Sequence, residues 1–398
     1  MPKAKFLILF TVLIDVIGLG IIIPVLPFFV SSFGVSPLLI TSLIAVYALC
    51  SFFSNPVLGA ISDRYGRKPV LFLSLLSTSI GWFVFASAHN VFQLFLGRVI
   101  DGLAAGNLST AQSYLVDLAK DEKERAHNLG YIGVLFGLGF VLGPFLGGTL
   151  SAISPNFPFL FVGFLALINA FVSWKYLPES NGAVRSVEKV SMNPFAPLKR
   201  AALNRPLWPS FSSWFFLGIA AFGMQSIISI YFKDVLHFSS FLTGMVITVV
   251  GITLVLNQGF ALKHFWLRRF KEFQLELWML LLCAVGFVAM GTWWVSVFFI
   301  GLFVTTLAQA ILRVVMNSIC IAKADENRRG EVMGIMGSLS NIASIIGPLL
   351  AGFLFQTHLH LPFFMSALFC LIAFFIILFS RHKKRTIDND VHLLKTSA

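Results

Sequence analysis

Four ionisable side chains lie inside long apolar runs of this 398-residue sequence: Asp15, Arg98, Asp101 and Arg313. A charge at the centre of a bilayer costs about 2.5–3.5 kcal/mol on insertion scales, so each such residue indicates a function or a neutralising partner. The proton affinity of a buried carboxylate changes with solvation and with nearby charge. We therefore expect Asp15 to carry a proton, with Asp101 as the second candidate and Arg98 stabilising the ionised acid. Mutual neutralisation of the two acids and two bases is the alternative.

Polar side chains recur at helical spacing beside both arginines. Residues three, four or seven positions apart share one face of a helix, and this relates Gln112 to Arg98 through Asp101 and Ala105, and Gln309 and Asn317 to Arg313. Such faces would line an aqueous cavity between helices. The candidate cavity residues are Gln112, Gln225, Asn257, Gln309, Arg313 and Asn317.

The composition predicts that helices crossing a membrane position these residues. The chain is 57% hydrophobic and 12% charged, with a mean hydropathy of +0.87, which leaves too little polar surface for a soluble globule. Runs of about 20 apolar residues match the thickness of a bilayer, and the alternating pattern of an outer-membrane barrel is absent. We predict an all-α membrane protein with twelve spans, at residues 6–30, 38–60, 69–88, 91–118, 127–151, 157–177, 207–232, 240–262, 273–292, 294–320, 330–355 and 361–380.

The net charge of +12 follows from membrane topology. Nearly all of the 29 lysines and arginines fall in alternate connections between the spans, and the opposite connections contain only Lys233. By the positive-inside rule, both termini are expected to be cytoplasmic. The bilayer, and not nucleic acid, is therefore the expected partner of this basic chain.

An internal repeat divides the chain. At an offset of 204 residues, the segment 121–148 matches 325–352, with Gly143-Pro144 over Gly347-Pro348. The sequence therefore predicts two pseudo-symmetric six-helix bundles, at 1–177 and 207–381, joined by a cytoplasmic linker at 178–206 and followed by a cytoplasmic tail at 382–398. Duplicated bundles of this kind hold a substrate near mid-membrane and rock around it, which is the architecture of a transporter.

The stretch GAISDRYGRKPVL, residues 59–71, connects spans two and three. Glycine permits close helix packing, Asp63 could face a helix N-terminus, and the basic residues could pair with acids at neighbouring helix ends. We expect Arg67 to pair with Asp117. The simpler alternative is a basic loop that only fixes topology. The candidate gate residues are Gly59, Asp63, Arg64, Gly66, Arg67, Lys68 and Asp117.

Span five is rich in glycine. Small residues three or four positions apart form a flat helix face, and a proline in the helix removes one hydrogen bond and bends it. Such a bend would help to set which side of the protein is open, and plain helix packing is the alternative. The motif consists of Gly130, Gly139, Gly143, Pro144, Gly147 and Gly148.

The order G-x-x-x-D-R-x-G-R-K at 59–68 resembles the signature of the major facilitator superfamily. GRVIDGLAAG (97–106) is similar to its fourth-helix arginine motif, the span-five glycines to its antiporter motif, and LPES (177–180) to another common mark. LIDVIGLGIIIPVLP (13–27) most resembles drug/proton antiporters of the tetracycline efflux branch. The resemblance implies proton-coupled export of small amphipathic molecules. We expect a monomeric carrier of the bacterial inner membrane whose partners are protons and a small-molecule substrate.

Two other classes of function stay open. The chain could export or import a specific metabolite, peptide or siderophore-like anion, with Arg313 binding the anionic group. It could also be a membrane receptor or structural protein that transports nothing. An enzyme is not expected, because the sequence has no metal-ligand cluster, catalytic triad, phosphate loop or cofactor motif. The four cysteines lie in predicted spans without ligand spacing and serve as small apolar residues. No cofactor is expected.

Overall fold

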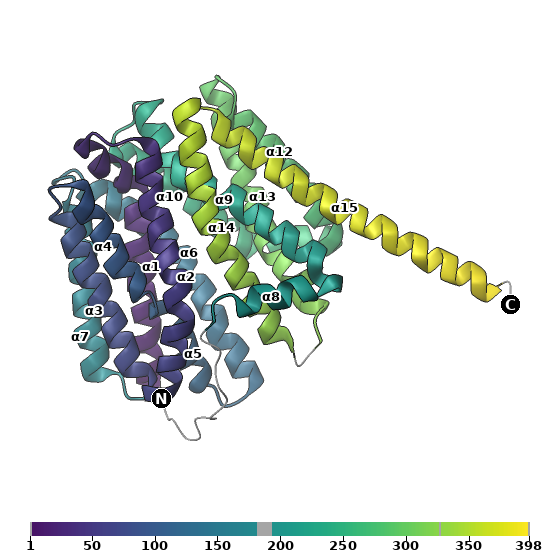
Figure 1. The fold of residues 1–398 in the computed structure, drawn as a ribbon, viewed down its shortest axis with the longest axis horizontal. Helices are drawn as coiled ribbons and strands as arrows, with labels where there is room; N and C mark the ends of the chain where they lie inside the picture. The colour runs from purple at the N-terminus through teal and green to yellow at the C-terminus, as the bar shows by residue number, and fades with distance from the viewer. Residues whose placement is uncertain (1, 181–192, 326–327, 397–398) are drawn as a thin grey trace.

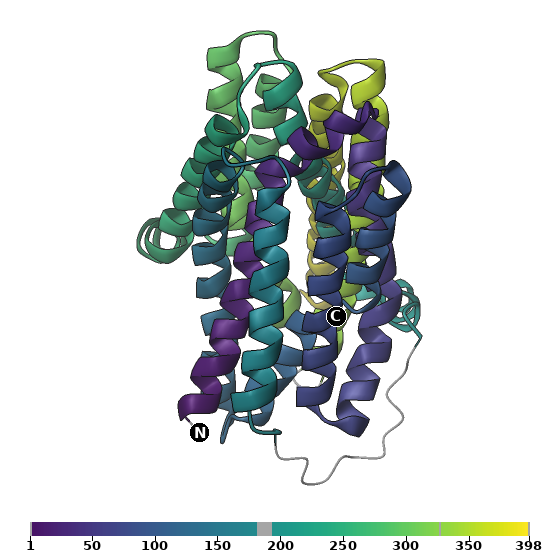
Figure 2. The same cartoon turned by 90° about the vertical axis from the view of Figure 1, so that its left-hand side faces the viewer.

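The computed structural model describes residues 2–180, 193–325 and 328–396, and these residues are helical nearly throughout. Eleven of the described helices are long and apolar enough to cross a membrane. They run lengthwise, with the helices before residue 180 on the left of Figure 1 and those after residue 193 on the right. Figure 2 shows α1 (Pro2–Val30) and α7 (Phe157–Tyr176) side by side. The prediction of an all-helical membrane protein is confirmed.

Short connections join the remaining helices on the left of Figure 1. Helix α1 packs along the glycine-rich α6, and α3 packs against α4 and α7. These helices are α2 (Pro37–Tyr65), α3 (Arg67–Ala86), α4 (Val91–Leu103), α5 (Asn107–Asp117) and α6 (Glu122–Leu150), with a 3-10 turn, η1, at Ser31–Phe33.

The helices on the right of Figure 1 follow a similar order. Helix α9 packs against α14 and α15, and α12 packs against α13. These helices are α9 (Trp208–Asp234), α10 (Ser240–Leu256), the π-helix η3 (Asn257–Trp266), α11 (Leu267–Arg269), α12 (Glu272–Met290), α13 (Val295–Ala322), α14 (Arg329–Thr357) and α15 (Leu361–Thr396). The segment predicted as a tail after residue 381 continues α15 as helix and projects from the body (Figure 1).

The fourth predicted span is not one helix, contrary to the expectation for residues 91–118. It ends as α4 at Leu103 and restarts as α5 at Asn107. Side chains take over the last carbonyls of α4: Ser54 Oγ donates to the Gly102 carbonyl oxygen at 2.9 Å, and Ser77 Oγ to that of Ile100 at 2.8 Å. These bonds satisfy carbonyls that a continuing helix would otherwise bond. Each half-span is too short to cross alone, which explains eleven long helices where twelve spans are predicted.

The eighth span also departs from the regular helix predicted over 240–262. From Asn257 to Trp266 the chain is a π-helix, a wider form usually limited to one turn. The Asn257 amide donates to the Leu307 carbonyl oxygen of α13 at 3.1 Å and accepts from Trp266 Nε1 at 3.1 Å. This amide therefore ties the wide turn to its own end and to α13.

Two helix pairs, α6 with α10 and α2 with α14, make the most extensive contacts between the two groups of helices, and both meet at the end far from the start of α1. In the first pair, a methyl group added at Gly148 of α6 would lie 3.2 Å from Gly244 Cα of α10, and Ser151 Oγ donates to Ser240 Oγ at 2.8 Å. In the second, a methyl group at Gly352 of α14 would clash with Thr41 of α2.

The same helix faces have separated at the end where α1 begins. A methyl group added at Gly130 or Gly133 of α6, at Gly59 of α2, or at Gly334 of α14 would meet nothing within 4 Å. Gly130, Gly133 and Gly137 continue one face of α6, yet only Gly137 reaches α10, through Val255. The glycine faces of both pairs are therefore closed at one end of the molecule and open at the other.

The predicted linker contains a short helix, α8 (Ala196–Leu203), followed by a 3-10 turn, η2 (Arg205–Leu207). The Phe195 ring packs edge to face on Phe52 of α2, with centroids 5.5 Å apart. Arg200 lies 3.8 Å from a carboxylate oxygen of Glu331 in α14. Helix α8 therefore contacts the second group of helices, and Phe195 just before it contacts the first group, at the open end (Figure 1).

His360 lies just before α15 and is 2% exposed, with its ring 4.2 Å from the Trp293 ring and 5.9 Å from that of Tyr231. Burial lowers the pKa of His360, and the neighbouring His358 lowers it further. The pKa of His360 in the folded protein lies below its unfolded value of about 6.5. The free energy of unfolding is therefore highest above that pH, and it decreases as the pH falls below it. We expect the unfolding temperature in detergent to fall between pH 7.5 and pH 5.5.

The His360→Gln variant should flatten this pH dependence, whatever its effect on the unfolding temperature itself. The exposed His89 offers a matched control: His89→Gln should keep the wild-type slope. A slope unchanged in His360→Gln would contradict the assignment.

Candidate functional site

The charge of Arg98, the first arginine inside an apolar helix, is neutralised by a neighbouring acid. Arg98 Nη1 lies 3.1 Å from Asp101 Oδ2, one turn along α4, and both side chains are at most 8% exposed. The guanidinium carbon is 4.5 Å from the ring centroids of both Tyr47 and Trp82. A cation over an aromatic face gains about 2 kcal/mol when desolvated. The arginine is therefore held in one place by an acid and two rings.

The contact between α3 and α4 positions this pair. A methyl group at Gly81 would lie 2.8 Å from the Gly97 carbonyl oxygen, and one at Gly97 would lie 2.7 Å from the Gly81 carbonyl oxygen. Only residues without a side chain permit such an approach. It brings Trp82, next to Gly81, onto the guanidinium of Arg98, next to Gly97.

Asp15 has a different environment. Its carboxylate oxygen Oδ1 accepts from Asn107 Nδ2 at 3.2 Å, and the same amide donates to Thr78 Oγ1 at 3.2 Å. Among the described residues, no lysine, arginine or histidine forms an ion pair with Asp15. Asn107 is the first residue of α5, so the break in span four places the positive end of the α5 dipole beside this acid. Asp15 is thus the acid that no cation neutralises.

The stretch 59–68 forms a network around Arg67. Its guanidinium lies 3.1 Å from Asp117 Oδ2 and 2.5 Å from Asp63 Oδ1, and it donates to Ser62 Oγ at 2.7 Å. The expected pair of Arg67 with Asp117 is therefore present. Asp63, however, does not cap a helix, as the sequence suggested, because it pairs with Arg67. Lys68 Nζ lies 5.3 Å from the Trp174 ring centroid, and the Arg64 guanidinium carbon lies 5.4 Å from that of Tyr65.

Glu179 caps α3 in place of Asp63. Its Oε1 accepts from the backbone N–H groups of Arg67 at 2.6 Å and Lys68 at 3.3 Å. Gly66 between α2 and α3 has φ of 108°, and a methyl group there would lie 2.6 Å from Glu179 Oε2. Glycine is needed at this position both for the backbone and for the acid that closes over it.

The span-five motif serves two faces of α6. Gly139, Gly143 and Gly147 face α1, where methyl groups would lie 2.5 Å from Val16 Cγ1, 2.6 Å from Gly20 Cα and 2.5 Å from the Ile21 carbonyl oxygen. Gly148 faces α10, and Gly130 faces open space. Pro144 lies inside the helix between them. The close packing of α1 on α6 holds Asp15 at its depth.

Among the described residues, no hydrogen bond or ion pair joins the candidate cavity residues to one another, and they differ in environment. Gln225 and Arg313 are exposed in the middle of long helices, and Gln112, Gln309 and Asn317 are partly exposed. Asn257 is buried and both ends of its amide are bonded within the protein. Its position supports a structural contact and not a free cavity group.

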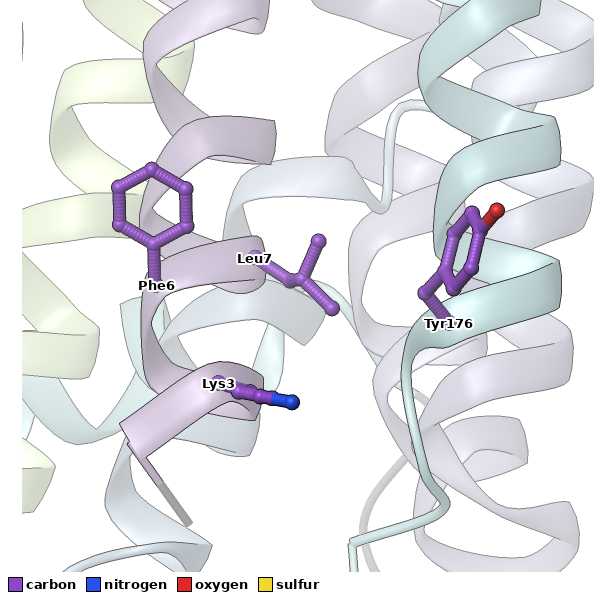
Figure 3. Close-up of a pocket in the computed structure, with 4 residues that line it drawn as sticks. All are labelled: Lys3, Phe6, Leu7 and Tyr176. Carbon is purple, nitrogen blue, oxygen red and sulfur yellow. The ribbon is translucent and has the colours of Figure 1, made fainter.

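A separate hollow of about 470 Å³ lies at the start of α1 and is lined by Lys3, Phe6, Leu7 and Tyr176. In Figure 3, Lys3 and Leu7 point toward Tyr176 across the gap between α1 and α7. Phe6 and Tyr176 are largely exposed on the outer surface. None of the ionisable residues of the membrane interior lines this hollow.

Sequence reasoning missed five residues that complete these sites. Asn107 directly follows the glycine that ends the break between α4 and α5, and a polar residue at that place in an apolar span could have indicated a site. Glu179 belongs to LPES, which was noted only as a family mark. Nothing in the sequence near Arg98 or Asn107 indicated the aromatic rings that contact Arg98 or the hydroxyl group that contacts Asn107, because these groups come from other helices. These residues are Tyr47, Thr78, Trp82, Asn107 and Glu179.

Comparison with known proteins agrees with this arrangement. The profile of the Major Facilitator Superfamily matches residues 8–290 and 265–393. The quinolone resistance protein NorA of Staphylococcus aureus is 28% identical over 394 residues, covering 96% of this chain and 98% of NorA. The class C tetracycline resistance protein of Escherichia coli is 28% identical over 355 residues, covering 87% of this chain and 88% of that protein.

Solved structures show the same fold. The human organic anion transporter MFSD10 (TETRAN) superposes with a TM-score of 0.70 at 23% identity, covering 94% of this chain and 99% of that one. The nucleoside transporter NupG gives 0.75 at 15% identity, covering 94% of this chain and 98% of that one. With eleven apolar helices and a family profile that matches nearly the whole chain, this multi-pass membrane protein is a transporter and not an enzyme, and it belongs to the major facilitator superfamily.

Proposed function

We propose that this protein is a proton-coupled antiporter that exports small amphipathic organic molecules by alternating access. The observation that carries the proposal is that the two buried acids have different partners. Arg98 is committed to Asp101, and Asp15 contacts only neutral polar groups among the described residues. A carboxylate without a fixed counterion can gain and lose a proton as its solvation changes, whereas a nearby cation favours the ionised form of a paired one.

The broken span supports a gated site at this acid. Interrupted helices at mid-membrane place backbone polar groups and dipole ends at binding sites for ions and substrates. Asp15 is the fourteenth residue of α1, and therefore lies about 20 Å from each end of that helix. An acid at this depth can be reached from one side or the other as the protein rocks.

The glycine faces support alternating access. Closed contacts at one end and separated faces at the other are what a carrier open to one side requires. We propose that residues 1–177 and 207–381 form two rocking six-helix bundles, with α4 and α5 together making the twelfth crossing. Since the basic residues cluster at the open end, we assign that end and both termini to the cytoplasm of a bacterial cell, with the protein a monomer in the inner membrane.

The names of the relatives support the substrate class. NorA and the class C protein carry names of resistance to quinolones and to tetracycline, which are amphipathic organic molecules. We assign the same class of cargo to this chain, moved outward in exchange for protons. Each proton entering down 100 mV supplies about 2.3 kcal/mol for this work.

The test is transport by purified protein in liposomes. With a pH gradient imposed across the membrane, a panel of cationic, zwitterionic and anionic amphiphiles should include compounds that accumulate against their own gradient. Collapse of the pH gradient should abolish that accumulation. Flux of every compound at the rate of protein-free liposomes, with or without the gradient, would refute the proposal and leave a non-transporting membrane protein.

A further inference from the structure

Arg313 lies deep in α13 and is nevertheless exposed. It is about 27 Å along the helix from Val295 and about 14 Å from Ala322, so it is well inside the membrane. Lipid does not account for the exposure. The exposed apolar residues Ile300, Phe303 and Val314 lie on a face about 100° away around the helix.

The face of Arg313 is polar. Gln309 and Asn317, one turn on either side, are both partly exposed. Helix α13 packs mainly on α12 and also contacts α9, α10 and α14, which are the helices of the second group that meet the first group. This polar face therefore opens toward the space between the two groups of helices.

The guanidinium of Arg313 has no counterion in the part of the chain that the structure describes. Within the described ranges, no carboxylate lies within ion-pair distance of it and no hydrogen bond reaches it. Asp15 and Asp101 are engaged elsewhere, since Asp101 pairs with Arg98 and Asp15 bonds to Asn107. The protein therefore neutralises one of its two interior arginines locally and, among the described residues, leaves the other exposed without a counterion.

We propose that Arg313 anchors a carboxylate group of the exported amphiphile. This inference rests on the proposed function and narrows its substrate class to organic monoanions and zwitterions. An unpaired guanidinium in a poorly hydrated cavity attracts an anion, and its planar fork matches a carboxylate through two parallel hydrogen bonds. A single positive charge balances a single negative one. Gln309 and Asn317 supply amide N–H donors on either side for the same group.

The test compares three matched pairs of probes in equilibrium binding to purified protein in detergent: 2-naphthoate with 2-naphthamide, 1-naphthaleneacetate with its amide, and 1-pyrenebutyrate with its amide. Each pair keeps the apolar body and removes the negative charge. Wild-type protein should bind the carboxylate about tenfold more tightly than the amide in at least one pair, as expected for a charge-assisted hydrogen bond.

The Arg313→Gln variant should lose this preference by weakening carboxylate binding while amide binding is unchanged. Arg313→Lys keeps the charge without the fork and should retain part of the preference. Arg268→Gln removes one positive charge from the exposed end of the bundle and should keep the wild-type ratio. Unchanged amide binding also shows that each variant is folded.

Two results would overturn the inference: no carboxylate preference by wild type in any pair, or the same preference in Arg313→Gln as in wild type. Either result is separate from the fate of the proposed antiporter. Gradient-driven flux in liposomes would persist if only the anion anchor were wrong, and would be absent for all compounds if the antiporter itself were wrong.

Discussion

Replacement of Asp15 by asparagine should reduce transport driven by a pH gradient to the level of protein-free liposomes. The amide has nearly the same shape as the acid and can still bond to Asn107, but it cannot exchange a proton. Exchange of labelled for unlabelled substrate across the membrane needs no net proton movement, so it should continue in Asp15→Asn. The measurement is therefore a pair of fluxes on one preparation, one gradient-driven and one exchange.

The control is Asp234→Asn, which removes an acid paired with Lys233 at the surface, and both of its fluxes should match wild type. Full gradient-driven transport by Asp15→Asn would remove the assignment and leave Asp101 as the candidate. Loss of both fluxes with normal insertion would mean that Asp15 is needed for the conformational change itself.

Leucine at Gly251 should open the contact that now closes the molecule. A side chain there would clash with the Phe140 carbonyl oxygen of α6, and overpacking of this kind costs about 1–3 kcal/mol. The population of the structure described here, relative to one open at the opposite end, should therefore fall by roughly 5- to 150-fold. The Gly133→Leu variant is the matched counterpart, since a side chain there meets nothing in this structure.

Spin labels at Lys123→Cys and Lys263→Cys, on exposed positions at the open ends of α6 and η3, report the change after the four native cysteines are replaced. Gly251→Leu should shorten the distance between labels, whereas Gly133→Leu should keep it long. A wild-type distance distribution in Gly251→Leu would falsify the assignment of these faces as alternating contacts.

Much of the fold follows from local sequence. Apolar length locates the long helices to within a few residues, as for α13, which was predicted at 294–320 and extends over Val295–Ala322. Charge at helix ends was enough to predict the pair of Arg67 with Asp117, because a basic turn and a nearby acid leave few other partners. These features depend on short-range pattern and on the solvent that surrounds the helix.

The interruptions could not be predicted in the same way. The break after Leu103 depends on hydroxyls from Ser54 and Ser77, which belong to other helices and replace the bonds of a continuous span. The π-helix likewise depends on contacts of Asn257 with α13 and Trp266. Such contacts are set by which helices become neighbours, and the order of residues in one span does not contain that information.

The position of α8 limits how far the molecule can open. Phe195, just before α8, rests on α2, and Arg200 in α8 reaches Glu331 in α14, so residues 195–203 connect the two groups of helices at the open end. Wider separation there stretches one of these two attachments, and the weaker is the 3.8 Å contact between the exposed Arg200 and the partly exposed Glu331. High salt, which screens that attachment but not the packing of aromatic rings, should therefore release the segment at its α14 end first.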